Sequence, residues 1–356
     1  MGKDNSHQSV TRRRALQLGA TASSISLAGC FGGGGDTIRF LSRGGTTQDA
    51  IADIMEKWSE DSGVTVEHQE ASADQEMIEI LSQNPGEIDL TDLSSTGLAH
   101  DTLQHDNELL HDFDYGEIPN YTENIRDDWQ DAPPIEDRDD AIAFFASTHG
   151  LAYNTDEVDD PTSWDVMDEY EGSLMLYNVS YARFGTAAIQ LGYDPTEAIE
   201  DESTREEVWE QVSDHNDLVF DYWSGGDEFM RMLQEEQAYV CEAWGGRVEA
   251  LHEDGYPVDY VIPDEGALTW SNWMNIPEAS ENKEDAYDLI NWLYEPENGT
   301  ELALDFKYSI PFEEPDEEMT ELFEYVESPD DLTWIDFEVM FQHMDELEDT
   351  WAEIRE

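Results

Sequence analysis

Residues 238–280 read AYVCEAWGGRVEALHEDGYPVDYVIPDEGALTWSNWMNIPEAS, and this stretch decides the fold. It begins with a short apolar run that ends at Trp244, and the pair Gly245-Gly246 then allows a close approach to the backbone. A β-like run, Val258–Ile262, a Pro-Asp-Glu-Gly turn and a second aromatic segment, Trp270–Ile276, follow. Tryptophans beside glycines and small or amide side chains are unusual in a core strand, so both aromatic segments favour a pocket wall.

The same stretch resembles the spermidine/putrescine-binding branch of the solute-binding proteins of ABC importers. The segments that match the motifs of that family are Gln237–Trp244, Tyr260–Ala267, Trp270–Asn272, Ile276–Ala279 and Ala286–Leu293, with Pro296 after the last. Weaker similarity continues upstream through Thr162–Trp164 and Gly172–Leu176 and covers most of the chain.

The resemblance implies an α/β chain with the type II periplasmic-binding-protein fold. In that fold two lobes are joined by two or three hinge crossings, and they close on a ligand without breaking any bond in it. We expect one lobe to hold residues 37–147 plus 270–308, and the other to hold residues 148–269 plus 309–356. The crossings are expected near His149-Gly150 and at Lys307–Pro311.

Local patterns agree with an α/β chain. Strands are expected at Thr37–Ser42, Val64–Val66 and Ile88–Leu90, with helices between them, and alternation of this kind indicates parallel strands whose ligand-facing loops lie at their carboxyl ends. The helix after the first strand has its apolar residues on one face, at Ile51, Ile54, Met55 and Trp58. Acidic helices are expected in the tail, from Glu317 to Glu356.

Residues 1–30 have the order of an export signal. Thr11–Arg14 carries three arginines before the weakly apolar run Ala15–Ala28, which fits a twin-arginine signal and is too short to span a membrane. Leu27–Cys30 resembles a lipobox, in which the cysteine is lipidated after cleavage, and residues 31–36 are a glycine-rich tether. We therefore expect an exported protein that is anchored by lipid on Cys30 to the outer face of the cell membrane.

The composition is strongly acidic. The 356 residues include 86 Asp and Glu but only 16 Lys and Arg, which gives a formal net charge of −70. Such a chain repels itself at low ionic strength and is relieved by salt, so we interpret the charge as adaptation to a salty environment. Eleven Trp, 15 Tyr and 13 Phe argue against disorder, and the lack of a basic patch argues against nucleic-acid binding.

Several windows contain no acidic residue, namely residues 37–48, 93–100, 141–155, 172–193, 243–248 and 266–277. Three of these windows, 37–48, 172–193 and 243–248, nevertheless hold arginines. Burial accounts for most of the missing acid, but an arginine buried without a carboxylate partner is costly. Arg39 is the arginine most suited to a structural role, whereas for Arg43, Arg183 and Arg247 both pairing with a distant carboxylate and contact with a ligand stay open.

The resemblance sharpens the question of the ligand's charge. Polyamine binders hold ammonium groups with carboxylates and aromatic faces, and the family has acidic ligands just after the strand that matches Leu174–Tyr177. Here that stretch, Asn178–Arg183, has no carboxylate, and Asn272 stands where the family has an aspartate. We therefore predict an anionic or zwitterionic solute, with a genuine spermidine/putrescine-binding protein as the alternative.

The predicted ligand-binding residues are Arg43, Ser94, Thr96, Tyr181, Arg183, Trp244, Arg247, Trp270 and Asn272. The guanidinium groups would pair with carboxylate or phosphonate oxygens, the tryptophans would stack on the solute or pack between the lobes, and Asn272 would donate a hydrogen bond. Cys241, in the apolar run, is expected to be a small buried side chain.

Other classes of function are less well supported by the motifs. An enzyme would need a catalytic motif, and neither a Ser/His/Asp context nor a phosphate-binding glycine loop nor a zinc-type Cys/His set is present. Relatives that bind ferric ion use adjacent tyrosines, and no Tyr-Tyr pair occurs. A surface interaction protein or a ligand-sensing receptor could use the same fold. We expect no cofactor or metal, a membrane permease as the partner, and a monomer.

Overall fold

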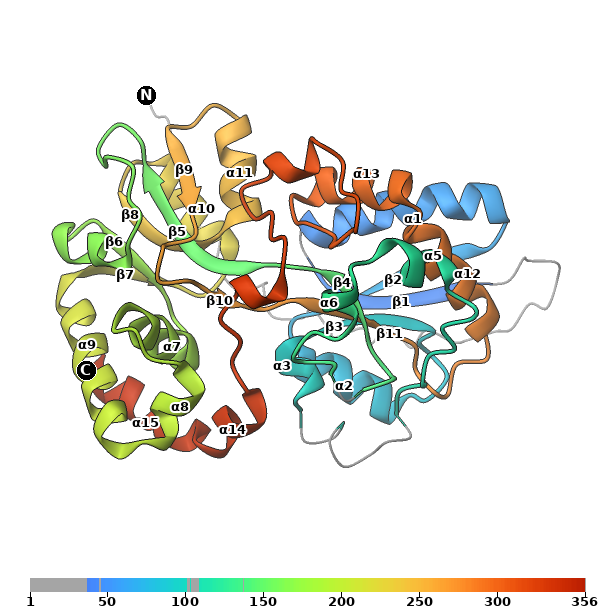
Figure 1. Ribbon diagram of the computed structural model, residues 1–356, viewed down its shortest axis with the longest axis horizontal. Coiled ribbons are helices and arrows are strands. Elements are labelled where there is room, and N and C mark those ends of the chain that lie inside the picture. The colour runs from blue at the N-terminus through green and yellow to red at the C-terminus, as the bar shows by residue number, and fades with distance from the viewer. Residues whose placement is uncertain (1–36, 45, 101–102, 104–108, 137, 356) are drawn as a thin grey trace, which may run out of the picture. The chain divides into compact units, whose positions relative to one another are not determined.

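The computed structural model describes residues 37–44, 46–100, 103, 109–136 and 138–355 (Figure 1). The expected export signal, the tether and Cys30 lie outside these residues. The described residues belong to one compact unit, residues 35–356, and this unit is the subject of all that follows. Within the described part of that unit, no helix is both long and apolar enough to cross a membrane.

The first sheet has five strands in the order β2-β1-β3-β11-β4. Their bounds are β1 (Thr37–Arg43), β2 (Thr65–Ala71), β3 (Leu90–Ser94), β4 (Ile142–Phe145) and β11 (Asn272–Asn275). Strand β1 pairs in parallel with β2 and β3, and β11 is antiparallel to β3 and β4. A segment from late in the chain therefore completes a sheet that the early part of the chain begins.

The second sheet follows the order β10-β5-β8-β6-β7, and β9 also pairs with β5. Its strands are β5 (Thr148–Asn154), β6 (Leu174–Tyr177), β7 (Val219–Trp223), β8 (Val240–Trp244), β9 (Val258–Val261) and β10 (Leu268–Thr269). Strand β6 is parallel to β7 and β8, whereas β5 is antiparallel to β8 and β9.

Helices surround both sheets. Those that belong with the first sheet are α1 (Thr46–Ser62), α2 (Asp74–Gln83), α3 (Ser95–Leu98), α5 (Pro119–Asn124), α6 (Asp127–Gln130), α12 (Lys283–Leu293) and α13 (Pro296–Phe306). Those that belong with the second are α7 (Ser180–Gln190), α8 (Pro195–Glu200), α9 (Glu202–Leu218), α10 (Gly226–Gln234), α11 (Gly245–Glu253), α14 (Phe337–Gln342) and α15 (Met344–Ile354). The apolar face expected on α1 is buried against the first sheet.

Each sheet has its own hydrophobic core, so the expected two-lobed α/β fold is confirmed. The chain passes between the sheets at residues 146–147 and again at residues 270–271. Ile310, Phe312 and Leu322 still pack in the first core, and the second core takes over at Ile335. The last passage therefore lies at residues 333–334, well beyond the crossing expected at Lys307–Pro311.

The first part of the tail differs from the acidic helices expected from Glu317 to Glu356. Residues 317–336 form only two short 3-10 turns, Met319–Glu321 and Pro329–Asp331, and α-helix begins at Phe337. Pro329 lacks the backbone N–H that an α-helix needs, and the preceding residue is pushed into extended conformation. The segment is instead fixed by its apolar side chains and by Glu324.

Glu324 is a fully buried carboxylate at the junction of the two sheets. It accepts hydrogen bonds from the backbone N–H of Thr148 at 3.0 Å and the hydroxyl of Thr148 at 2.8 Å, and from Tyr260 at 3.1 Å and Ser147 at 3.3 Å. The backbone N–H of Gly246, at the start of α11, also donates to it at 3.4 Å. Hydrogen bonds to this one side chain thus connect residues 317–336 to residues 147–148, to β9 and to the N-terminus of α11. The dipole of a helix favours negative charge at that end.

The Gly245-Gly246 pair makes this contact possible. A Cβ atom on Gly245 would come within 2.2 Å of the Glu324 side chain, and one on Gly246 within 2.7 Å of the carbonyl oxygen of Lys307. The close approach expected at the two glycines is therefore made by other parts of the same chain, the side chain of Glu324 and the backbone of Lys307.

We predict that Glu324 makes the stability of the fold depend on pH. Burial raises its pKa from 4.5 to about 7, so the folded state holds the proton more tightly than the unfolded state does. Its contribution to stability is full below pH 4.5 and is lost as the pH rises through about 7. Urea unfolding at constant high salt gives the free energy of unfolding of wild type and of Glu324→Gln. The value for wild type minus that for the variant should fall by about 3 kcal/mol between pH 5 and pH 8.

The matched control is Glu321→Gln, which changes an exposed glutamate in the same segment. Its difference from wild type should stay constant over this range. A constant difference for Glu324→Gln as well would contradict the assignment.

Candidate functional site

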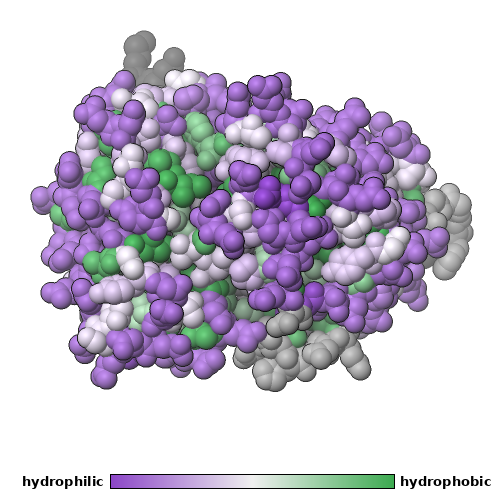
Figure 2. Space-filling view, viewed as in Figure 1, coloured by the Kyte–Doolittle hydropathy of each residue, from purple (hydrophilic) through white to green (hydrophobic). Residues whose placement is uncertain are grey.

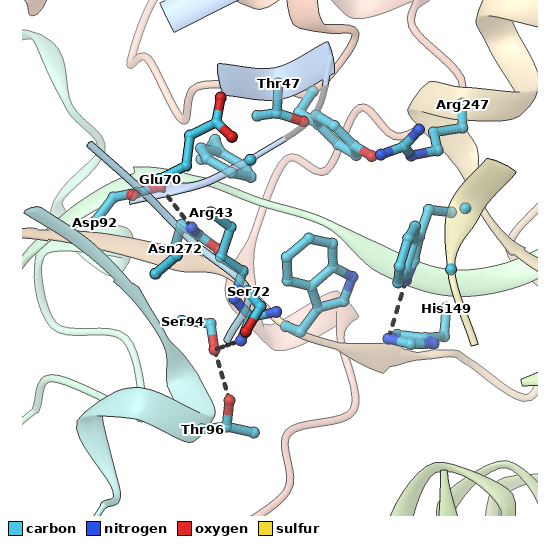
Figure 3. A pocket seen from close by; sticks show the side chains of 18 of the residues that line it. Arg43, Thr47, Glu70, Ser72, Asp92, Ser94, Thr96, His149, Arg247 and Asn272 are labelled. Atoms are coloured by element: carbon cyan, nitrogen blue, oxygen red, sulfur yellow. Dashed lines mark hydrogen bonds between the residues drawn. The ribbon is translucent and has the colours of Figure 1, made fainter. Parts of the chain in front are cut away.

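A cavity of about 720 Å³ opens where the strands of both sheets end (Figure 3). The residues that line it come from the carboxyl ends of β1, β2 and β3 on one side and of β6 and β8 on the other. Loop residues at the carboxyl ends of parallel strands commonly form binding sites, and this volume suits a small molecule.

The predicted binding residues divide into those that line this cavity and one that does not. The lining includes Arg43, Ser94, Thr96, Tyr181, Trp244, Arg247, Trp270 and Asn272. Arg183 is absent from the lining. The aromatic segments around Trp244 and Trp270 thus do reach a pocket wall, as the sequence pattern favours.

Arg43 ends β1 and is paired with Asp74 at the start of α2. The same carboxylate accepts hydrogen bonds from the hydroxyls of Ser94, at 2.6 Å, and Thr96, at 2.8 Å. Burial works to raise the pKa of Asp74, but Arg43 and the two hydroxyls hold it below its usual value. Burial likewise works to lower the pKa of Arg43, and Asp74 raises it. The charge of Arg43 is therefore already matched within the protein.

Arg183 lies on α7, inside the second core, and its side chain is 1% exposed. It is paired with Glu242 on β8, which is 0% exposed and also accepts hydrogen bonds from Thr186 at 2.8 Å and from the backbone of Tyr177 at 2.9 Å. Of the two roles left open for Arg183, the structure thus favours pairing with a distant carboxylate. The sequence pattern could not separate the two roles, because Glu242 lies on a strand 59 positions away.

Arg247 is the other arginine of the wall, on α11. Its nearest carboxylate is Asp227, at 3.3 Å, and that side chain is 98% exposed. Its guanidinium lies 5.9 Å from the centre of the Trp244 ring and close against Gly226, where a Cβ would come within 2.5 Å of it. An exposed ion pair contributes little to stability. The guanidinium of Arg247 is therefore more available than that of Arg43 to pair with a solute.

Aromatic rings form the middle of the wall. The centres of Trp244 and Trp270 are 5.6 Å apart, and His149 and Tyr177 pack beside them. The Nε2 atom of His149 accepts a hydrogen bond from Trp244 at 3.3 Å (Figure 3). Burial, and then the charge of Arg183, lowers the pKa of His149 to about 3. His149 is therefore neutral at physiological pH and carries its proton on Nδ1.

Carboxylates also line the cavity, which the sequence analysis did not expect. They are Glu70 and Glu76, both exposed, and Asp92, which is buried. Asp92 directly precedes the acid-free window of residues 93–100, and Glu70 lies near the end of β2, a strand longer than predicted. Attention to carboxylates at the carboxyl ends of β2 and β3, rather than only to the family's acidic positions, could have identified them.

A two-lobed α/β fold whose strand ends meet at a cavity of small-molecule size defines a class of binding proteins that enclose a solute. Residues 53–320 match the model of the family described as bacterial extracellular solute-binding protein, and the chain belongs to this family.

Similar proteins place the chain more closely. The spermidine/putrescine-binding periplasmic protein of Escherichia coli (strain K12) is 25% identical over 265 residues, which span 72% of this chain and 73% of that protein. The spermidine/putrescine ABC transporter substrate-binding protein PotD from Streptococcus pneumoniae matches with a TM-score of 0.77 and 22% identity, over 90% of this chain and 100% of that one. The TpPotD lipoprotein of Treponema pallidum matches with a TM-score of 0.75 and 18% identity, over 90% and 99%. The resemblance indicated by the motifs is confirmed: the chain is an extracellular solute-binding protein, and it is similar to spermidine/putrescine-binding proteins.

We predict that Arg183 supports the fold and not the ligand. Arg183→Ala should lower the free energy of unfolding by about 3–5 kcal/mol, because it leaves the charge of Glu242 buried and unpaired. Urea unfolding at constant salt measures this change, and the control Arg231→Ala, which removes half of an exposed i,i+4 pair, should cost less than about 1 kcal/mol. The double variant Arg183→Leu/Glu242→Leu should recover much of the loss. A fully stable Arg183→Ala with weakened solute binding would contradict this prediction.

Proposed function

We propose that this protein is an exported, lipid-anchored receptor that captures an anionic or zwitterionic small solute and delivers it to the permease of an ABC importer. The observation that carries the ligand assignment is Arg247, a largely buried cation in the wall whose nearest carboxylate is fully exposed. A solute carboxylate could exchange for Asp227 and gain charge-assisted hydrogen bonds in a less hydrated place.

Polyamine binding is the second candidate, and two observations favour it. Glu70, Glu76 and Asp92 line the cavity, and the similar proteins named above are called spermidine/putrescine-binding. A diamine would leave Arg247 facing an ammonium group, however, and like charges in a partly desolvated site cost affinity. The charge of the solute at Arg247 therefore separates the two candidates.

The remaining parts of the proposal come from the sequence. Leu27–Cys30 supports lipid anchoring at the outer face of the membrane, and the cavity offers a binding site without a catalytic motif, which supports capture of a solute without chemistry. We infer a monomer. The net charge of −70 and the mostly hydrophilic face seen in Figure 2 support adaptation to high salt.

The test uses three solutes of equal chain length that differ only in their end groups: putrescine, 4-aminobutyrate and succinate. We expect the purified protein, titrated in high salt near pH 8 and followed by tryptophan fluorescence, to bind 4-aminobutyrate or succinate more tightly than putrescine. Arg247→Gln should weaken binding of the two carboxylates about tenfold or more, since a hydrogen bond to a charged group contributes about 1.5–3 kcal/mol. Putrescine binding should stay unchanged or improve.

Arg231→Gln serves as the control, because it removes a surface guanidinium from the neighbouring α10 without touching the cavity lining. Tight putrescine binding that Arg247→Gln leaves untouched, with no binding of either carboxylate, would assign the protein to the polyamine binders instead.

A further inference from the structure

Two polar side chains on neighbouring strands face the cavity and lie deep in its wall. Asp92 is on β3 and Asn272 is on β11, two strands that pair directly. Each side chain belongs to a residue that is only 4% exposed, and both line the cavity. The Nδ2 atom of Asn272 donates a hydrogen bond to Oδ2 of Asp92 at 2.7 Å (Figure 3).

This hydrogen bond leaves two acceptors unpaired. An ionised carboxylate only accepts, so the amide nitrogen of Asn272 must face it, and the amide oxygen must then point elsewhere. Oδ1 of Asp92 and Oδ1 of Asn272 have no hydrogen-bond partner within the part of the chain that the structure describes. A buried acceptor without a partner costs free energy, so a hydrogen-bond donor from outside the protein would gain free energy by binding at this pair.

No ion pair to Asp92 forms among the residues that the structure describes. Arg43 acts on Asp92 through its charge, but it is paired with Asp74, and Asp74 repels the same carboxylate. Glu70 and Glu76 add further negative charge to the cavity lining. Burial, opposed by the hydrogen bond from Asn272, raises the pKa of Asp92 to about 7. With the cavity free of solute, this carboxyl group is therefore about half protonated near neutral pH.

We propose that Asp92 and Asn272 together form an ammonium subsite, in which a primary amine of the solute donates hydrogen bonds to the two unpaired oxygens. This inference rests on the proposed function and narrows it. The two ends of the solute are bound by different walls, the amine by β3 and β11 and the carboxylate by Arg247 on α11. The solute is then a zwitterion whose charged ends are separated by an apolar segment that lies against Trp244 and Trp270.

Binding at this subsite is linked to a proton. An ammonium group beside Asp92 favours the carboxylate form, so the amine displaces the proton of the half-protonated group. The affinity for an amine should fall about tenfold for each pH unit below about 7 and level off above it. A solute without an amine should not show this dependence.

The test compares butylamine with butyrate, a matched pair that carries one charged end each. The readout is the side-chain amide signal of Asn272 in the NMR spectrum of the whole protein, assigned by its loss in Asn272→Ser. At pH 8 in high salt, butylamine should shift this signal in a saturable way, and butyrate should not. The apparent affinity for butylamine should drop about fivefold from pH 7 to pH 6.

Asp92→Asn removes the charge but leaves two amides that can still pair, so this variant should fold. It should lose at least tenfold in affinity for butylamine and all of the pH dependence. The matched control is Glu79→Gln, which removes an exposed carboxylate of α2 that does not line the cavity and should change the affinity less than threefold. No saturable shift with butylamine in the wild type, or an unchanged response in Asp92→Asn, would overturn the subsite.

The outcome separates this inference from the proposed function. Arg247→Gln could weaken carboxylate binding while Asp92→Asn has no effect on amine binding. In that case the ammonium subsite is wrong, and the proposal that Arg247 binds a carboxylate of the solute stands. If Asp92→Asn abolishes amine binding while Arg247→Gln has no effect on carboxylates, the subsite stands and the polyamine reading replaces the proposed solute.

Discussion

Glu324 joins three parts of the chain at the junction of the two sheets, and the shape of the cavity depends on that junction. Its carboxylate receives donors from the first passage between the lobes, from β9 and from the start of α11. Gly245 must lack a side chain for this contact to form, and Gly246 must lack one because it packs against Lys307 and Tyr308. Because Trp244 and Arg247 flank the two glycines, the same contact fixes both cavity residues in place. A buried carboxyl group with many hydrogen-bond partners is a precise anchor, since few other arrangements satisfy it.

The electrostatics of the cavity follow from where each charge finds its partner. In a chain with so many carboxylates almost every guanidinium meets one, so pairing alone says little. What matters is whether the partner is buried. Arg183 and Arg43 have buried partners, Glu242 and Asp74, and act as neutral structural units. Arg247 has an exposed partner, and its charge is open to exchange with a solute.

The sequence predicted the two-lobed fold, the aromatic wall and eight of the residues that line the cavity, because Trp, Gly and acid-free windows are local signals. It could not separate Arg183 from Arg247, since each sits in an acid-free window and the partners come from distant strands or helices. It missed α11, whose two leading glycines look like a turn, and it missed the irregular segment around Glu324, whose acidic composition resembles a helix. It also overlooked Asp92, because its importance comes from an unpaired oxygen that only the packing of β3 against β11 creates.

The central claim is that the two charged ends of the solute bind to opposite walls of the cavity. A crystal structure of the protein with 4-aminobutyrate tests this claim most directly. The account predicts the amine nitrogen within about 3 Å of Oδ1 of Asp92 and Oδ1 of Asn272, and the carboxylate against the guanidinium of Arg247 with Asp227 displaced. A complex with the solute in the reverse orientation, or bound away from both walls, would contradict it.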